Sequence, residues 1–85
     1  MFRKMSNQDI KERELLYLSA RTNGLYEEIG KAKMGLSENE FRKKYRKRIN
    51  KVLGEVAKSG FKESEIPKAR WALKELRRYK KEIDR

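Results

Sequence analysis

The sequence contains no cysteine and no histidine. The chain therefore cannot form a disulfide, a thiolate nucleophile or a zinc site built on Cys or His, and it lacks the commonest general base. No apolar run approaches the roughly 20 residues of a membrane span. The N-terminal stretch MFRKMSNQDI is basic but leads to no apolar segment of signal-peptide type. We expect a cytoplasmic protein that holds no metal ion and no cofactor.

Catalytic groups are also scarce. The carboxylates that could act in pairs, in hydrolysis or in magnesium binding, are Glu12, Glu14, Glu27 and Glu28. They lie among lysines and arginines, where ordinary surface pairing explains them. A chain of 85 residues makes one small domain, in which a deep catalytic cleft is hard to build. We expect a single domain over residues 1–85 that is not an enzyme.

Positive charge is what the chain has in excess. It carries 24 Lys and Arg against 13 Asp and Glu, a net charge of +11. The excess lies after Ser37, with +5 in residues 37–60 and +4 in residues 61–85. Such an imbalance favours a polyanionic partner, nucleic acid first and an anionic membrane surface second. We expect no membrane partner, because the domain needs the apolar face of its amphipathic third helix for its core. The alternative is a lysine-rich solvated surface, but +11 exceeds what solubility requires.

The pattern of apolar residues predicts an all-α protein, because no segment alternates with period two. We expect a compact four-helix domain, with helices over about Asn7–Thr22, Leu25–Lys33, Glu38–Lys58 and from Ser64 towards Ile83. Asn23 and Gly24 would end the first helix. Its core-facing residues would be Ile10, Leu15, Leu16, Leu18 and Ala20.

The stretch MGLSENEF, residues 34–41, predicts a tight helical corner. Ser37 can act as the N-cap of a helix and Glu40 can complete a capping box. Leu36 and Phe41 stand at the positions of a hydrophobic staple. Gly35 can end the preceding helix in the left-handed conformation. This spacing suits a helix-turn-helix over about residues 25–58.

The helix after this corner has two unlike faces. Its apolar residues, which fall within an arc of about 120°, are Phe41, Tyr45, Ile49, Val52, Leu53 and Val56. The polar face offers two asparagines that can pair with adenine, two arginines that can pair with guanine and two lysines suited to phosphates. These residues are Asn39 and Asn50, Arg42 and Arg46, and Lys43 and Lys47. We interpret this face as a candidate DNA-reading surface; a solvated basic face is the alternative.

The last helix is expected over about residues 65–84, with Pro67 tolerated in its first turn. Gly60 and Phe61 would end the helix before it. It carries a basic row within an arc of about 100°, made of Arg70, Lys74, Arg77, Arg78, Lys81 and Arg85. Trp71 lies at the edge of this row. It could stack on a base, or pack against the first helix or a second subunit. The row itself predicts a phosphate-tracking surface.

Four short stretches carry a resemblance to a known family. The pieces KERELLYLSA, YEEIG, GLSENEF and INKVLG, between Lys11 and Gly54, resemble the helix-turn-helix domains of the LuxR/GerE type and, more distantly, sigma-factor region 4. In that family the segment that begins with the turn serine lies in the DNA major groove. The resemblance implies that Ser37, Asn39, Arg42, Lys43 and Arg46 lie at or near DNA.

These observations predict a small DNA-binding protein, a transcriptional regulator that reads duplex DNA with the helix starting at Ser37. The DNA-binding residues we expect are Ser37, Asn39, Arg42, Lys43, Arg46, Lys47, Asn50, Arg70, Lys74 and Arg78. A homodimer would fit, because one small module buries limited DNA surface. Two alternatives stay open: a helical adaptor that docks on an acidic protein of the transcription or replication machinery, and a protein that binds structured RNA.

Overall fold

A computed structural model describes residues 7–84, and Arg85 of the predicted basic row lies outside this range. Its elements are α1 (Asn7–Ala32), the 3-10 turn η1 (Lys33–Gly35), α2 (Glu38–Ser59), the 3-10 turn η2 (Glu63–Glu65) and α3 (Arg70–Ile83). No strand forms in these residues, so the all-α class is confirmed. There are three α-helices among them rather than four.

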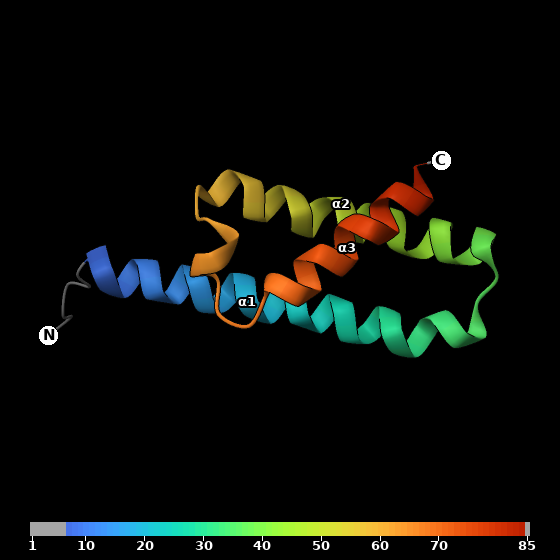
Figure 1. The fold of residues 1–85 in the computed structure, drawn as a ribbon, viewed down its shortest axis with the longest axis horizontal. Helices are drawn as coiled ribbons and strands as arrows, with labels where there is room; N and C mark the ends of the chain where they lie inside the picture. The colour runs from blue at the N-terminus through green and yellow to red at the C-terminus, as the bar shows by residue number, and fades with distance from the viewer. Residues whose placement is uncertain (1–6, 85) are drawn as a thin grey trace, which may run out of the picture.

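The helices form a hairpin with a third helix laid across it. α1 and α2 run side by side in opposite directions, and α3 crosses both of them at an angle (Figure 1). The radius of gyration is 14.9 Å, larger than the roughly 12 Å expected for a compact chain of this length. The first turns of α1 extend past the other helices and account for this elongation (Figure 1). None of the described helices is long and apolar enough to cross a membrane.

The core contains two adjoining apolar clusters. The larger one takes side chains from all three helices: Leu25, Ile29, Phe41, Tyr45, Ile49, Val52, Leu76, Tyr79 and Ile83. The smaller one joins the middle of α1 to the end of α2 and the start of α3, through Leu18, Val56, Ile66, Ala69 and Leu73. The predicted apolar face of the helix after Ser37 is therefore the face that the fold buries. α3 buries Ala72, Leu73, Leu76, Tyr79 and Ile83.

The two helices predicted before Ser37 are one helix. α1 passes through Asn23 and Gly24 without interruption, so the predicted stop was wrong. Leu18, Thr22, Leu25 and Ile29 follow one another at helical spacing and are all buried. Packing of this stripe outweighs the roughly 1 kcal/mol that a glycine costs in a helix. The Asn23 side chain bonds back to the preceding turn of the same helix: its Nδ2 donates to the Ser19 carbonyl oxygen at 2.9 Å.

The outer residues of the first helix were also assigned wrongly. Ile10, Leu16 and Ala20, predicted to face the core, are exposed, and Leu16 keeps 63% of its surface accessible. Leu15 is half-buried and Leu18 buried, as predicted. Burial of Leu18, Thr22, Leu25 and Ile29 fixes which side of α1 faces the core, and Ile10, Leu16 and Ala20 consequently face outward.

α2 starts at the predicted N-cap, but Glu40 contacts the Ser37 hydroxyl and not the Ser37 amide that a capping box requires. Ser37 is the N-cap, and its hydroxyl accepts from the Glu40 amide at 3.3 Å. Leu36 and Phe41 both join the larger cluster, as a hydrophobic staple requires. Gly35 does not adopt the predicted left-handed conformation. Among the glycines only Gly60 has a positive φ, of 75°. Gly60 ends α2 in the left-handed conformation, as predicted.

The last helix begins later than predicted. The chain forms η2 at Glu63–Glu65, and α3 starts only at Arg70. Ile66 has an extended backbone with ψ of 114°, because a residue before proline is sterically kept out of the helical region. Pro67 therefore stands in a break between two helical segments and not in the first turn of one.

The predicted helix-turn-helix is not confirmed. In that motif two helices meet at roughly 90–120° across a short turn. Here the helix before the turn is the long α1, and α2 returns along its side (Figure 1). The N-cap at Ser37 starts a new helix after a tight corner, and this corner joins the two helices of a hairpin.

Candidate nucleic-acid interface

The outer face of α2 carries the densest group of predicted site residues. Lys43, Arg46, Lys47 and Asn50 are all exposed. They lie opposite the buried row of Phe41, Tyr45 and Ile49, since residues three and four apart share one face of a helix. We call these four residues the α2 crest. It presents two ammonium groups, a guanidinium and an amide within about two turns.

Three other predicted residues at the start of α2 are placed differently. The Ser37 hydroxyl is used in capping α2, where it also donates to Glu40 Oε1 at 3.1 Å. Arg42 donates from Nη2 to the carbonyl oxygen of Glu82 at 3.3 Å and so ties α2 to the end of α3. Asn39 is exposed between Glu38 and Glu40, two acidic residues in the first turn. The first turn of α2 is therefore its acidic end, and the crest begins after it.

A groove separates α2 from α3. One shallow depression is lined by Arg46 and Asn50 from α2 and by Lys80 and Asp84 from α3. A second depression adjoins it and shares Leu53, Ala57 and Lys80 with the first. The floor is apolar or small, and the rim continues with Lys62, Arg77 and Lys81. The two depressions form one groove, whose lining has more cations than acids; its acidic members are Asp84 and Glu63.

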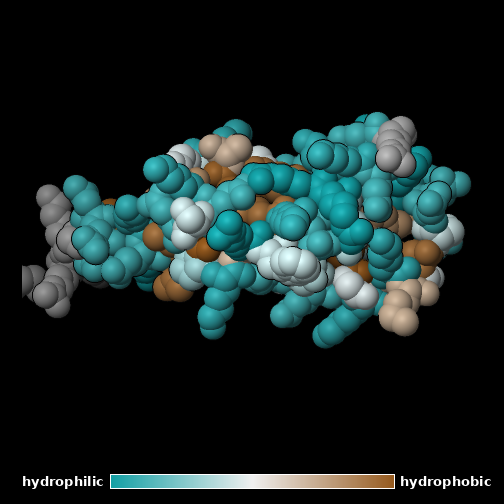
Figure 2. Space-filling view, in the orientation of Figure 1, coloured by the Kyte–Doolittle hydropathy of each residue, from teal (hydrophilic) through white to brown (hydrophobic). Residues whose placement is uncertain are grey.

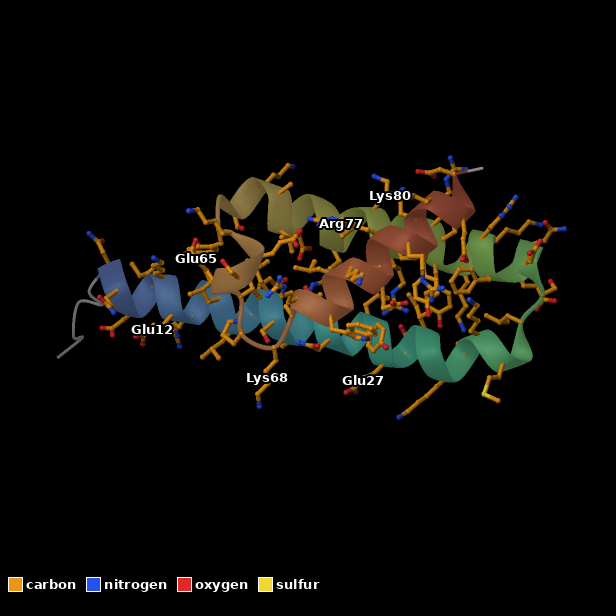
Figure 3. All side chains as sticks on the ribbon, viewed as in Figure 1. Glu12, Glu27, Glu65, Lys68, Arg77 and Lys80 are labelled. Carbon is orange, nitrogen blue, oxygen red and sulfur yellow. The ribbon has the colours of Figure 1, made fainter. Side chains whose placement is uncertain are left out.

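The crest of α3 bears the other predicted group. Arg70, Lys74 and Arg78 line one depression together with Arg77, Lys81 and two acidic residues, Glu63 and Glu75. The face of the molecule that α3 crosses is hydrophilic over most of its area, with apolar side chains visible between the helices (Figure 2). Figure 3 places Arg77 and Lys80 on the part of α3 that crosses α2. The basic surface therefore extends from the α2 crest, across the groove, to the crest of α3.

Ion pairs take up cations between the helices and on α3. Arg21 binds the Glu55 carboxylate through Nε and Nη2 at 3.1 and 2.9 Å. These hydrogen bonds raise the pKa of the Arg21 guanidinium above its usual value. Arg48 pairs with Glu28 across the same helix interface.

On α3, Arg77 pairs with Glu63. Arg78 contacts Glu75 at 2.6 Å, and this hydrogen bond raises the pKa of Arg78. Within residues 7–84, no acidic side chain forms an ion pair with Lys43, Arg46 or Lys47. The cations of the α2 crest are therefore available to an external anion.

Trp71 contacts the first helix. Its indole Nε1 donates to the Tyr26 hydroxyl on α1 at 3.2 Å. The ring remains 60% exposed, and the Lys74 ammonium lies 5.5 Å from its centroid. Of the alternatives left open by the sequence, the structure shows packing against α1.

Lys80 is the residue that sequence reasoning missed. It lies beside the apolar stripe of α3, apart from the predicted basic row, and faces Arg46 and Asn50 across the groove. The sequence places Lys80 at the margin of the apolar face of its helix, a position typical of the edge of a helix–helix contact. The residues opposite Lys80 depend on the angle at which α3 crosses α2, and the sequence does not indicate that angle.

The described residues contain no group of three or more His, Cys, Asp or Glu side chains placed to hold a metal ion. No family model, no curated protein and no solved structure matches this chain. The resemblance to LuxR/GerE-type domains thus stays a prediction, and the geometry of the basic surface supplies the remaining argument about function.

Proposed function

We propose that the protein binds duplex DNA through the α2 crest and the adjoining side of α3, and that it acts as a small transcriptional regulator. The observation that carries this proposal is the row of exposed cations Lys43, Arg46 and Lys47, which make no ion pair within residues 7–84. Phosphate neutralisation by such residues supplies most of the affinity of DNA-binding proteins.

The middle of α2 rather than its start would meet the duplex. Glu38 and Glu40 place negative charge in the first turn, where it would repel phosphates. Lys43 and Lys47, one turn apart, suit two phosphates, while Arg46 and Asn50 offer the donors that guanine and adenine edges accept. Lys80 and the cations of the α3 crest would contact the flanking backbone.

Binding of a short duplex by Lys47→Gln, measured by fluorescence anisotropy at several salt concentrations, tests this assignment. The variant should bind more weakly, and the slope of log affinity against log salt should fall by about 1, since one phosphate contact is lost. Lys68→Gln is the matched control. This substitution removes the same charge, and Lys68 is exposed in the loop before α3. Equal losses in the two variants, or unchanged binding by Lys47→Gln, would remove α2 from the interface.

An acidic helical segment of a partner protein is the second candidate ligand. The groove between α2 and α3 favours it, because Leu53 and Ala57 form an apolar floor and Lys80 and Lys81 lie on the rim. A helix with leucines on one side and glutamates on the other matches such a groove. This candidate uses the groove, whereas DNA would use the crests beside it.

A further inference from the structure

The side of α1 that faces away from α2 and α3 exposes several large apolar side chains. Leu16, Tyr17 and Ile10 keep 63%, 56% and 46% of their surface exposed. The buried residues of α1, Leu18 to Ile29, lie on the opposite side. Figure 3 shows Glu27 projecting from α1 away from α2 and α3. This side of α1 therefore combines exposed apolar side chains with charged ones, as the margin of a protein–protein contact does.

A single stripe runs along the centre of this outward side. It consists of Asp9, Arg13, Leu16, Ala20, Gly24, Glu27 and Lys31, all of them exposed. At 100° per residue they fall within about 40° of Ala20 on either side. Their positions are symmetric about Ala20, at offsets of four, seven and eleven residues in each direction. We call these residues the α1 stripe.

Charged residues at equal distances before and after Ala20 in the α1 stripe have opposite signs. Arg13 lies seven residues before Ala20, and Glu27 lies seven residues after it. Asp9 lies eleven residues before it, and Lys31 eleven residues after it. In an antiparallel pair of these helices, each cation of one copy therefore faces an acid of the other. The stripe itself carries no net charge.

We propose that α1 pairs antiparallel with α1 of a second copy of this chain, with Ala20 against Ala20 at the two-fold axis. Arg13 of each copy then faces Glu27 of the other, and Asp9 faces Lys31, so that four ion pairs form around the axis. Such an isologous contact is closed and self-complementary, as most homodimers are.

The residues nearest the axis suit a close approach of two helices. Ala20 and Gly24 are small, and a Cβ built on Gly24 meets no other atom within 4 Å. In the proposed register Leu16 of one copy lies over Gly24 of the other. Small residues at a crossing point let helix axes come within about 8 Å. The partner would also cover the first turns of α1, which extend past the rest of the molecule (Figure 1).

The distribution of charge favours this face over any other for self-association. α1 contains four cations and five acids, whereas α2 contains eight cations and three acids, and α3 six cations and two acids. Contact through α2 or α3 would bring two strongly basic surfaces together. Contact through α1 keeps them apart and leaves the α2 crest of each copy open, so the inference does not depend on what that crest binds.

A charge-swap cycle followed by sedimentation equilibrium tests the register. The wild-type chain should show a concentration-dependent dimer. Arg13→Glu and Glu27→Arg should each weaken it by about tenfold or more, because either change turns two attractive pairs into two repulsive ones. The double variant should restore the dimer, since it reverses both members of each pair. Lys58→Glu, an equal charge change on α2, should leave it unaltered.

The cycle separates contacts across the interface from effects within one helix. Each swap also changes pairs inside α1, and circular dichroism of every variant reports any loss of helix. The double variant does not repair pairs within α1, so its recovery is specific to the contact between copies. A wild-type chain that stays monomeric up to about 1 mM, or a double variant as weak as the single ones, would overturn the proposal.

Discussion

Gly24 and Gly60 show how differently one residue type serves the fold. Gly24 lies inside α1, where a Cβ would meet nothing within 4 Å. Gly60 ends α2 with a φ of 75°, a conformation that only glycine adopts without strain. Gly24 is therefore replaceable in the folded chain, whereas Gly60 is required where it stands.

Alanine at the two positions should have opposite effects on stability. Gly24→Ala should raise the free energy of unfolding by about 0.5–1 kcal/mol, because alanine loses less backbone entropy in a helix. Gly60→Ala should lower it by about 1–2 kcal/mol, the cost of a left-handed backbone with a Cβ. Urea unfolding of dilute protein measures both. A destabilised Gly24→Ala would show that α1 is broken at this point.

The turn η2 is held by Glu65. Its Oε1 accepts from the Lys62 amide at 2.9 Å, and its Oε2 lies 3.4 Å from the Lys11 ammonium on α1. The backbone hydrogen bond from Lys62 is the larger cause, and the Lys11 side chain a further one, that lowers the pKa of Glu65 below its usual value. This carboxylate connects the short turn to the first helix.

Glu65→Gln should destabilise the protein in a pH-dependent way. A carboxylate with a lowered pKa in the folded state stabilises the fold above its unfolded pKa, and loses that contribution as the pH falls through the folded pKa. The urea midpoint of Glu65→Gln should thus lie below that of the wild type at pH 7, and the two should converge well below about pH 4. Glu12→Gln, exposed on α1, is the control. A difference that persisted at low pH would contradict the assignment.

Elements with local signals were predictable from sequence. α2 begins at the predicted N-cap, Ser37, and ends at Gly60, because both signals act within a few residues. The predicted start of α3 was wrong because Pro67 sterically keeps Ile66 out of the helical region. The predicted break at Gly24 was wrong because the local stop signal is outweighed by packing along the whole of α1. That packing depends on residues far away in the sequence.

At the scale of the molecule, the candidate site was predictable only within each helix. The α2 crest follows from helical spacing, and its residues are exposed as expected. The groove that brings Lys80 opposite Arg46 depends on how α3 crosses α2, and no local pattern encodes that crossing. The sequence therefore indicated two basic helices but not the surface that they form together.

Filling the groove should distinguish its two candidate ligands. Ala57→Leu places a larger apolar side chain on the floor of the groove without removing any cation. Binding of a synthetic amphipathic peptide, with leucines on one side and glutamates on the other, should fall by about tenfold or more, because the floor is occupied. Binding of a short duplex should stay within about twofold, since phosphates contact the crests. Anisotropy with both labelled ligands measures this, and a parallel loss would mean that they share the groove.

The composition of the larger apolar cluster determines how the chain folds. α1 supplies Leu25 and Ile29, α2 supplies Phe41 and Tyr45, and α3 closes the cluster with Tyr79, whose ring lies 5.8 Å from that of Phe41. A hairpin of α1 and α2 alone would leave these side chains open to water on the side that α3 covers. No pair of helices holds the whole of this cluster, so we expect the three helices to unfold in a single cooperative transition.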